Sequence, residues 1–212
     1  MNIQDIRKDY TQHELDEAAL REDPIAQFSS WFEEALKAEV LEANACALAT
    51  VDELGNPHNR IVLLKGVSES GFQFFTNYTS DKANEIGQNA AVAMTFFWKE
   101  LERQVRIEGR VSKMSEEDSQ AYFSSRPHMS QLGAWVSNQS QVISSRSVLE
   151  QRLEELMQRY PEGTDVPYPA HWGGFELTPT KVEFWQGRPS RLHDRICYVQ
   201  IDQRWHKQRL AP

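Results

Sequence analysis

The segment from Glu183 to Arg195, EFWQGRPSRLHDR, gathers basic side chains in a chain whose formal net charge is −8. If the chain runs extended after Pro189, side chains two residues apart share a face. Arg191, His193 and Arg195 would then point to one place. Arginine suits phosphate because its guanidinium offers charge-assisted hydrogen bonds in a bidentate fork. The row therefore predicts a local site for a small anion.

A second set of hydrogen-bond donors stands near the ends of predicted strands and helices. Together they would suffice for two phosphorylated ligands, or for one ligand with two anionic ends. Taken singly, each is more often a solvated charge, a turn former or a half-buried helix residue, and Trp185 is more often a core residue than a platform for a ring. Arg60 and Lys65 lie five residues apart, so they would face opposite sides of a regular strand and need a bend to serve neighbouring ligands. The set comprises Arg60, Lys65, Lys82, Gln104, Tyr122, Arg126, Ser130, Gln139 and Ser140.

Several common catalytic motifs do not occur in the sequence. It contains no GxGxxG after a strand, no GxxxxGK[ST], no GxSxG and no HExxH. A nucleotide would therefore be held by side chains and by strand or loop amides. Cys46 and Cys197 stand alone, which predicts neither a disulfide framework nor a cysteine-based metal site.

The elements that must position these side chains begin with a helix. Asp23 and Pro24 supply an N-cap and a first-turn proline, and apolar residues follow at helical spacing up to Leu36. Strand patterns then follow in ACALATV, RIVLLKGV, FQFFTN, AVAMTFFW and RQVRIEGRV, and later in GGFELTP, KVEFWQG, CYVQID and RWHKQRL.

Further helices interrupt the strands. Ser80 is predicted to cap a short helix, Ser115 opens another, and SRSVLEQRLEELMQRY carries one apolar stripe. Ser130, Gln139 and Ser140 are predicted to lie in loops after Pro127.

These patterns predict a mainly β fold, a barrel of seven to nine strands with peripheral helices. Residues 23–212 would form a single domain, and residues 1–22, charged and without an apolar stripe, a mobile arm. The acidic balance argues against a general nucleic-acid binder. No apolar run approaches the ~20 residues that span a bilayer, so the expected compartment is the cytoplasm.

A resemblance to a known family rests on stretches that occur here in one order: RIVLLK, FFTN..S.KA, LERQVRIEG, YFSSRP..SQLGAWVS.QS, HWGGFE, EFWQG...RLHDR and RLAP. Together they resemble the pyridoxamine 5'-phosphate oxidase family, from residue 6 to the end of the chain. The resemblance implies an FMN-binding split β-barrel and a homodimer with FMN at the subunit interface. The implied reaction oxidises pyridoxamine 5'-phosphate and pyridoxine 5'-phosphate to pyridoxal 5'-phosphate, with O2 as electron acceptor, giving H2O2.

The resemblance also implies residue roles. It places FMN contacts on Arg60, Ile61, Val62, Leu63, Leu64, Lys65, Phe75, Thr76, Lys82, Gln104, Gln139, Ser140, Trp185 and Arg195. It places substrate contacts on Lys65, Tyr122, Arg126, Ser130, Arg191, Leu192 and His193, and on Arg7 and Tyr10 of an N-terminal lid. Arg191 and His193 are the implied catalytic residues, and no metal is implied.

Two positions depart from the family pattern. The family commonly has Arg-Lys after the serine of the phosphate-binding segment, whereas this chain has Asp81 and Lys82 after Ser80. Asp81 cannot hold a phosphate, so one expected cation is missing and weaker FMN binding is expected. Phe75 stands where tyrosine is frequent, a change that a backbone contact would tolerate.

Two other functions are compatible with a barrel of this kind. A non-catalytic carrier would bind flavin or pyridoxal phosphate without reduction of the flavin by substrate. A barrel for single-stranded nucleic acid would use aromatic platforms and basic side chains and would show a steep salt dependence. The carrier is disfavoured because the sequence has both sets of implied substrate contacts: Arg191-Leu192-His193, and Tyr122 with Arg126 and Ser130.

Overall fold

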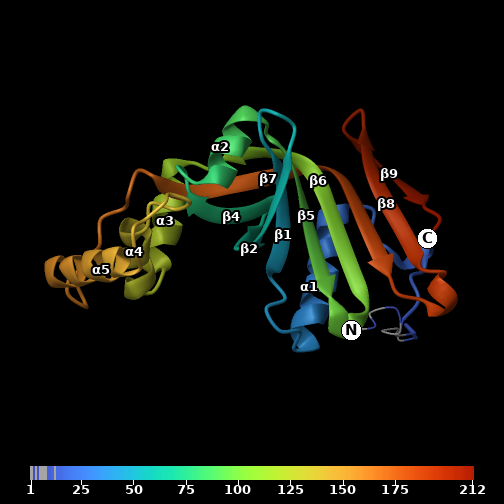
Figure 1. The fold of residues 1–212 in the computed structure, drawn as a ribbon. Coiled ribbons are helices and arrows are strands. Elements are labelled where there is room, and N and C mark those ends of the chain that lie inside the picture. Colours follow the sequence, from blue (N-terminus) through green and yellow to red (C-terminus); the bar gives the residue numbers. More distant parts are fainter. Residues whose placement is uncertain (1, 3, 5–8, 12) are drawn as a thin grey trace.

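A computed structural model of the chain describes residues 2, 4, 9–11 and 13–212. Its centre is one nine-stranded sheet with helices around it (Figure 1). The strands are Ala45–Val51 (β1), Pro57–Leu63 (β2), Gly66–Val67 (β3), Phe72–Asn77 (β4), Ala91–Trp98 (β5), Arg103–Lys113 (β6), Trp172–Gln186 (β7), Asp194–Ile201 (β8) and Arg204–Arg209 (β9). The helices are Pro24–Lys37 (α1), Asp81–Gln88 (α2), Glu116–Ser125 (α3), His128–Val136 (α4) and Ser147–Arg159 (α5), with short 3-10 turns at Glu17–Ala19 (η2), Lys99–Leu101 (η3) and Pro189–Arg191 (η4).

The sheet divides around its longest strand, β7. One edge of β7 pairs antiparallel with β6 from Phe175 to Gln186. The other edge pairs with β4 near its start and with β8 near its end. Beyond these neighbours, β6 continues through β5 and β1 to β2, β4 pairs with β3, and β8 pairs with β9. The β4 and β8 branches therefore leave opposite ends of one strand (Figure 1).

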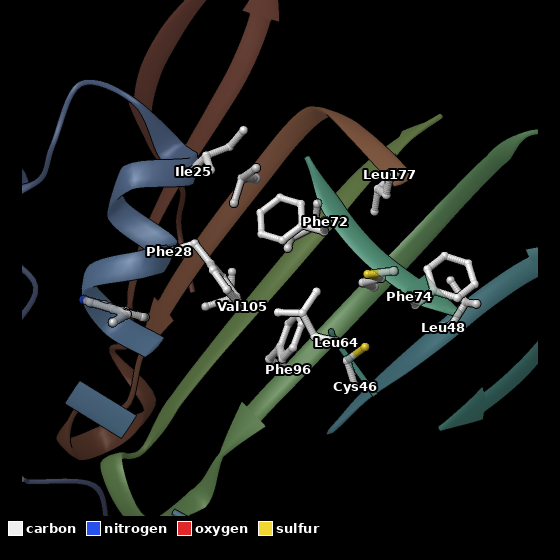
Figure 2. Close-up of a cluster of buried hydrophobic side chains, with 14 of the residues drawn as sticks. Ile25, Phe28, Cys46, Leu48, Leu64, Phe72, Phe74, Phe96, Val105 and Leu177 are labelled. Carbon is white, nitrogen blue, oxygen red and sulfur yellow. The ribbon is translucent and has the colours of Figure 1, made fainter. Parts of the chain in front are cut away.

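The main core lies between α1 and one face of the sheet. The Asp23 carboxylate caps α1 by accepting a hydrogen bond from the Ala26 N–H, and Pro24 takes the first helical position. The helix directs Ile25 and Phe28 at the strands (Figure 2). Phe28 is fully buried and meets Phe72 and Phe96 edge-on, with ring centroids 4.9 and 5.0 Å away. Burial of these rings gives the sheet one dry face.

A smaller core forms where α3 and α4 pack against the start of β7. Phe123, Leu132 and Trp172 are buried there, with Leu153 and Leu156 of α5 packed against them. This helical group lies at the end of the molecule opposite β8 and β9 (Figure 1). The stripe predicted on α5 thus packs by one face, although none of its residues is fully buried.

Most predicted elements are confirmed, but several predictions are wrong. Ser130 lies inside α4, because the turn at Pro127 starts a new helix in place of a loop. GGFELTP and KVEFWQG are parts of one strand, β7, whose pairing with β6 shifts register opposite Pro179. Ser80 stands at the N-cap of α2, but its hydroxyl donates to the Asn77 carbonyl and caps nothing.

A further wrong prediction is the extended row after Pro189. The chain instead turns through η4, and Ser190 and Arg191 have positive φ values of 55° and 62°. β8 begins only at Asp194. Arg191 and His193 are therefore carried by a turn in front of β8, and Arg195 by the strand itself.

The described part of the predicted N-terminal arm lies against the body of the molecule. Leu15 and Leu20 are buried in the main core. The Thr11 N–H donates to the Glu102 carboxylate at 2.9 Å, and the Leu15 N–H donates to Asp194 at 3.2 Å. The predicted mobility of residues 1–22 stays a prediction, and Arg7 lies outside the described residues. No helix in the described part of the chain is long and apolar enough to cross a membrane.

Candidate functional site

A cavity of about 860 Å³ lies between the edge strand β2, the end of β4, α2 and the α3–α4 pair. This volume is in the range of small-molecule sites. Four basic side chains and one acidic side chain line it, in contrast to the acidic balance of the whole chain. The cavity thus offers an anion a local excess of positive charge. The predicted residues that line it are Arg60, Ile61, Val62, Leu63, Lys65, Phe75, Thr76, Lys82, Tyr122, Arg126, Ser130, Gln139 and Ser140.

Lys82 organises one end of the cavity. Its ammonium group lies 2.9 Å from the Gln139 amide oxygen and 3.2 Å from the Thr76 hydroxyl. The Ser140 hydroxyl is close by, because it accepts a hydrogen bond from the Asp81 N–H at 3.2 Å. Burial and the nearby Arg60 lower the pKa of Lys82. A buried cation surrounded by neutral oxygens gains most from an anionic ligand.

Arg60 forms the wall beside Lys82, and a buried carboxylate holds it. Its guanidinium donates to Glu85 at 3.1 Å, to Thr50 and to the Leu48 carbonyl. Glu85 also accepts hydrogen bonds from Thr50 and His58. Burial alone would raise the pKa of Glu85, but these donors outweigh it and the pKa falls. Glu85 is therefore ionised at neutral pH, and Arg60 is fixed in place.

Lys65 reaches the same cavity because the strand breaks before it. β2 ends at Leu63, and the Lys65 N–H donates to the Gln73 carbonyl of β4. Arg60 and Lys65 therefore both line the cavity, although five residues separate them. Leu64 differs from its neighbours: its side chain is buried in the main core, so only its backbone is left to face a ligand.

The other end of the cavity is aromatic and cationic. The rings of Phe75 and Tyr122 stack with centroids 3.9 Å apart, and Trp172 stacks on Phe75 at 5.4 Å. The Arg126 guanidinium lies 4.5 Å from the centroid of Trp172. Within the described part of the chain, Arg126 Nη1 is buried and has no hydrogen-bond partner. Such an orphaned donor fits an anionic group that binds there.

Most of the other described residues with a predicted role form a second group, on β6, β7 and β8 and in the turn before β8. Gln104, Trp185 and Arg195 are cross-strand neighbours. Arg195 is held by a bidentate contact with buried Glu183, at 2.8 and 3.1 Å. The His193 ring lies 4.7 Å from Trp185, and Tyr10 contacts both rings. Leu192, in the same turn, is 70% exposed. We call Gln104, Trp185, Arg191, Leu192, His193 and Arg195 together the β8 row.

His193 carries its proton on a defined nitrogen. Its Nδ1 accepts a hydrogen bond from the Arg188 N–H at 3.0 Å, so the neutral ring is protonated on Nε2. Burial, and to a smaller extent Arg191, lowers the pKa of His193. At neutral pH the ring therefore offers a neutral N–H donor.

β7 keeps the cavity and the β8 row apart. Phe75 pairs with Gly174 near the start of β7, and Arg195 pairs with Trp185 near its end. Eleven residues of strand correspond to roughly 35 Å at ~3.3 Å per residue, far more than a side chain spans. One chain alone therefore does not bring its two groups of predicted residues together.

Sequence reasoning missed several residues that hold the site. Glu85, His58, Thr50 and Glu183 position arginines, and Trp172 lies against Arg126. Trp172 and Glu183 carried a signal, as parts of the HWGGFE and EFWQG stretches. The described His, Cys, Asp and Glu residues include no group of three or more that could hold a metal ion.

Comparisons with known proteins agree along the whole chain. Residues 32–160 match the family model "Pyridoxamine 5'-phosphate oxidase", and residues 172–212 match "Pyridoxine 5'-phosphate oxidase C-terminal dimerisation region". A pyridoxine/pyridoxamine 5'-phosphate oxidase of Acaryochloris marina is 53% identical, covering 100% of this chain and 96% of the relative. One from Actinobacillus pleuropneumoniae serotype 5b is 54% identical, with 100% of both chains covered.

Solved structures share the fold. PhzG from Burkholderia lata, in complex with tetrahydrophenazine-1-carboxylic acid, has a TM-score of 0.91 and 25% identity, covering 97% of this chain and 100% of that chain. A pyridoxamine 5'-phosphate oxidase-related, FMN-binding protein from Nostoc punctiforme has a TM-score of 0.71 and 20% identity, covering 87% and 97%. The FMN-binding split-barrel fold is thereby confirmed.

The contact between Glu85 and His58 leads to a prediction of how the stability of the fold depends on pH. The hydrogen bond to Glu85 raises the pKa of His58 above its ordinary value. The contact therefore stabilises the fold fully below about pH 6.5, and this contribution is lost as the pH rises through the raised pKa. We expect NMR titration to place the His58 pKa above 6.5 and Glu85→Gln to return it toward that value.

The same substitution tests the sign of the linkage. The loss of thermal stability in Glu85→Gln should be larger at pH 6 than at pH 8.5, where only Arg60 still pairs with the carboxylate. A stability loss that is equal at both pH values would contradict the assignment.

Proposed function

The chain belongs to the pyridoxine/pyridoxamine 5'-phosphate oxidase family, and from this premise we propose which of its residues perform the family's reaction. The protein is an FMN-dependent oxidase that converts pyridoxamine 5'-phosphate and pyridoxine 5'-phosphate to pyridoxal 5'-phosphate, with O2 as acceptor and H2O2 as product. It carries the family's C-terminal dimerisation region. The observation that carries the proposal is the single cavity that gathers Arg60, Lys65, Lys82 and Arg126.

The FMN phosphate would be held at the Lys82 end of the cavity. Lys82 is a buried cation among neutral oxygens, and Arg60 is locked beside it by Glu85. Thr76, Gln139 and Ser140 add hydroxyl and amide groups. These donors fit a phosphate monoester, which accepts several charge-assisted hydrogen bonds. FMN, when bound, supplies the two-electron acceptor of the reaction and passes the electrons on to O2.

The substrate phosphate would be held at the aromatic end. Arg126 offers an unpartnered buried donor, and Lys65, Tyr122 and Ser130 line the same wall. Arg126 and Lys65 supply positive charge, and the two hydroxyls supply neutral donors. The substrate is thereby anchored by its phosphate, which leaves its ring free to be oriented by other residues.

The β8 row would act on the substrate ring. We assign Arg191 to orienting the pyridine ring and stabilising charge that develops on it, and His193 to donating a hydrogen bond from Nε2. Gln104, Trp185 and Arg195 would contact the flavin. Tyr10, whose ring lies 5.7 Å from Trp185, would close the site together with Arg7.

A second copy of the chain would complete the site. The sheet face that carries Gln104 and Trp185 also exposes apolar side chains: Phe97 is 54% exposed, and Ile61 is 68% exposed at the edge of the cavity. Exposed apolar surface of this kind is typical of subunit interfaces. In the proposed homodimer this face is covered, and the β8 row of one subunit meets the cavity of the other, with FMN between them. The cytoplasm remains the expected compartment.

The reaction is tested by an anaerobic visible spectrum of the FMN-loaded protein with pyridoxine 5'-phosphate. We expect the flavin bands to bleach and to return in air. Arg191→Ala should lower the rate of bleaching about 100-fold, or ~2.7 kcal/mol of barrier, while the FMN dissociation constant changes less than about twofold. Arg204→Ala, at the exposed start of β9, is the control for loss of a positive charge.

Two outcomes of these measurements would contradict different parts of the proposal. Flavin binding without bleaching would favour a carrier. An unchanged rate in Arg191→Ala would remove that residue from catalysis.

Asp81 makes a second prediction, on cofactor affinity. This exposed carboxylate lines the cavity close to Lys82 and repels a phosphate. Asp81→Arg should lower the FMN dissociation constant about tenfold, because one charge-assisted hydrogen bond is worth about 1.5–3 kcal/mol. Quenching of FMN fluorescence measures the constant. Glu162→Arg makes the same charge change outside the cavity lining and should have no such effect; equal effects of the two variants would refute a local role for Asp81.

A further inference from the structure

The environment of Arg126 differs from that of Arg60 and Arg195, two other arginines of the proposed site. Arg60 is paired with Glu85, and Arg195 with Glu183. Arg126 has no carboxylate partner among the described residues, and its guanidinium carbon lies 4.5 Å from the centroid of the Trp172 ring. Burial lowers the pKa of Arg126, which is the signature of a cation that lacks a counter-charge.

Trp172 is itself firmly held. It is 6% exposed and is the first residue of β7. Its N–H donates to the Pro169 carbonyl at 3.0 Å, and its carbonyl accepts from the Tyr168 hydroxyl at 2.5 Å. Phe75 stacks on its ring at 5.4 Å and Phe123 meets it at 5.6 Å. The indole is therefore a rigid surface for the guanidinium.

An aromatic face holds an arginine in a way that a carboxylate does not. The ring attracts the cation through its quadrupole and leaves the N–H groups in the guanidinium plane free. A carboxylate would take up those N–H groups and cancel the charge. Arg126 thus keeps a full positive charge and a buried, unpartnered Nη1 for an incoming anion.

We propose that Trp172 is a positioning residue that holds Arg126 ready for the phosphate group of the substrate, and so makes the enzyme selective for phosphorylated over unphosphorylated pyridoxine. This inference rests on the proposed role of Arg126 in binding the substrate phosphate. Trp172 acts through Arg126 and contributes no hydrogen bond to the substrate.

The test compares Trp172→Leu, which keeps an apolar side chain but removes the π face, with Trp172→Phe, which keeps a smaller π face. We expect KM for pyridoxine 5'-phosphate to rise about tenfold in the leucine variant and about threefold in the phenylalanine variant. The inhibition constant of inorganic phosphate should rise in parallel, and kcat and the FMN dissociation constant should change less than twofold. A purely structural role would instead change FMN affinity and kcat along with KM, whereas some loss of thermal stability is expected from any substitution of this buried ring. If Trp172→Leu does not fold, the phenylalanine variant decides.

A double-mutant cycle separates this inference from the function on which it rests. Arg126→Met should raise KM for pyridoxine 5'-phosphate on its own, and adding Trp172→Leu to it should cause no further rise. A further tenfold rise in the double variant would overturn the inference, because Trp172 would then act without Arg126. A raised KM in Arg126→Met with an unchanged KM in Trp172→Leu would overturn the inference alone. An unchanged KM in Arg126→Met would overturn the assigned role of Arg126 as well.

Discussion

The pairing of β7 with three other strands fixes where the two groups of predicted site residues lie. One strand pairs with β6 along most of its length, and on its other edge it pairs with β4 at the start and β8 at the end. The side chains proposed to bind phosphate lie near β4, at the start of β7, and those of the β8 row lie near the end of β7. Backbone hydrogen bonds fix both positions, so no side-chain movement within one chain joins them. A catalytic site built from both groups therefore requires two copies of the chain, and the proposed homodimer would supply them.

Arg60, Arg126 and Arg195 of the proposed site are held in two different ways, and the difference matches the roles proposed for them. Arg60 and Arg195 are locked by buried carboxylates, which fix their geometry and lower the net charge that they present. Such groups suit a cofactor that remains bound through many turnovers. Arg126 lies against Trp172 and keeps its full charge. That arrangement suits a substrate phosphate, which must be captured from solution and released again after each turnover.

Local sequence patterns predicted the strands well, because alternation and turn residues act over short distances. They also predicted α1, whose cap lies in two adjacent residues, Asp23 and Pro24. They failed at Ser190 and Arg191, because these residues adopt positive φ values that residues other than glycine rarely adopt. The carboxylate partners of the arginines could not be predicted from local patterns for another reason. Glu85 and Arg60 are 25 residues apart and meet only because α2 packs on β1, the strand that pairs with β2. The resemblance to a family supplied candidate residues, but only the fold separated them into two groups.

The most direct test of the shared site is complementation between two defective subunits. A heterodimer purified with two different tags would combine Arg126→Met, which damages the cavity, with Arg191→Ala, which damages the β8 row. If each site takes its cavity from one subunit and its row from the other, the heterodimer contains one intact site and one doubly damaged site. It should then show about half the activity of the wild-type dimer, since two-fold symmetry gives two equivalent sites. Activity no higher than the mean of the two variant homodimers would contradict the account.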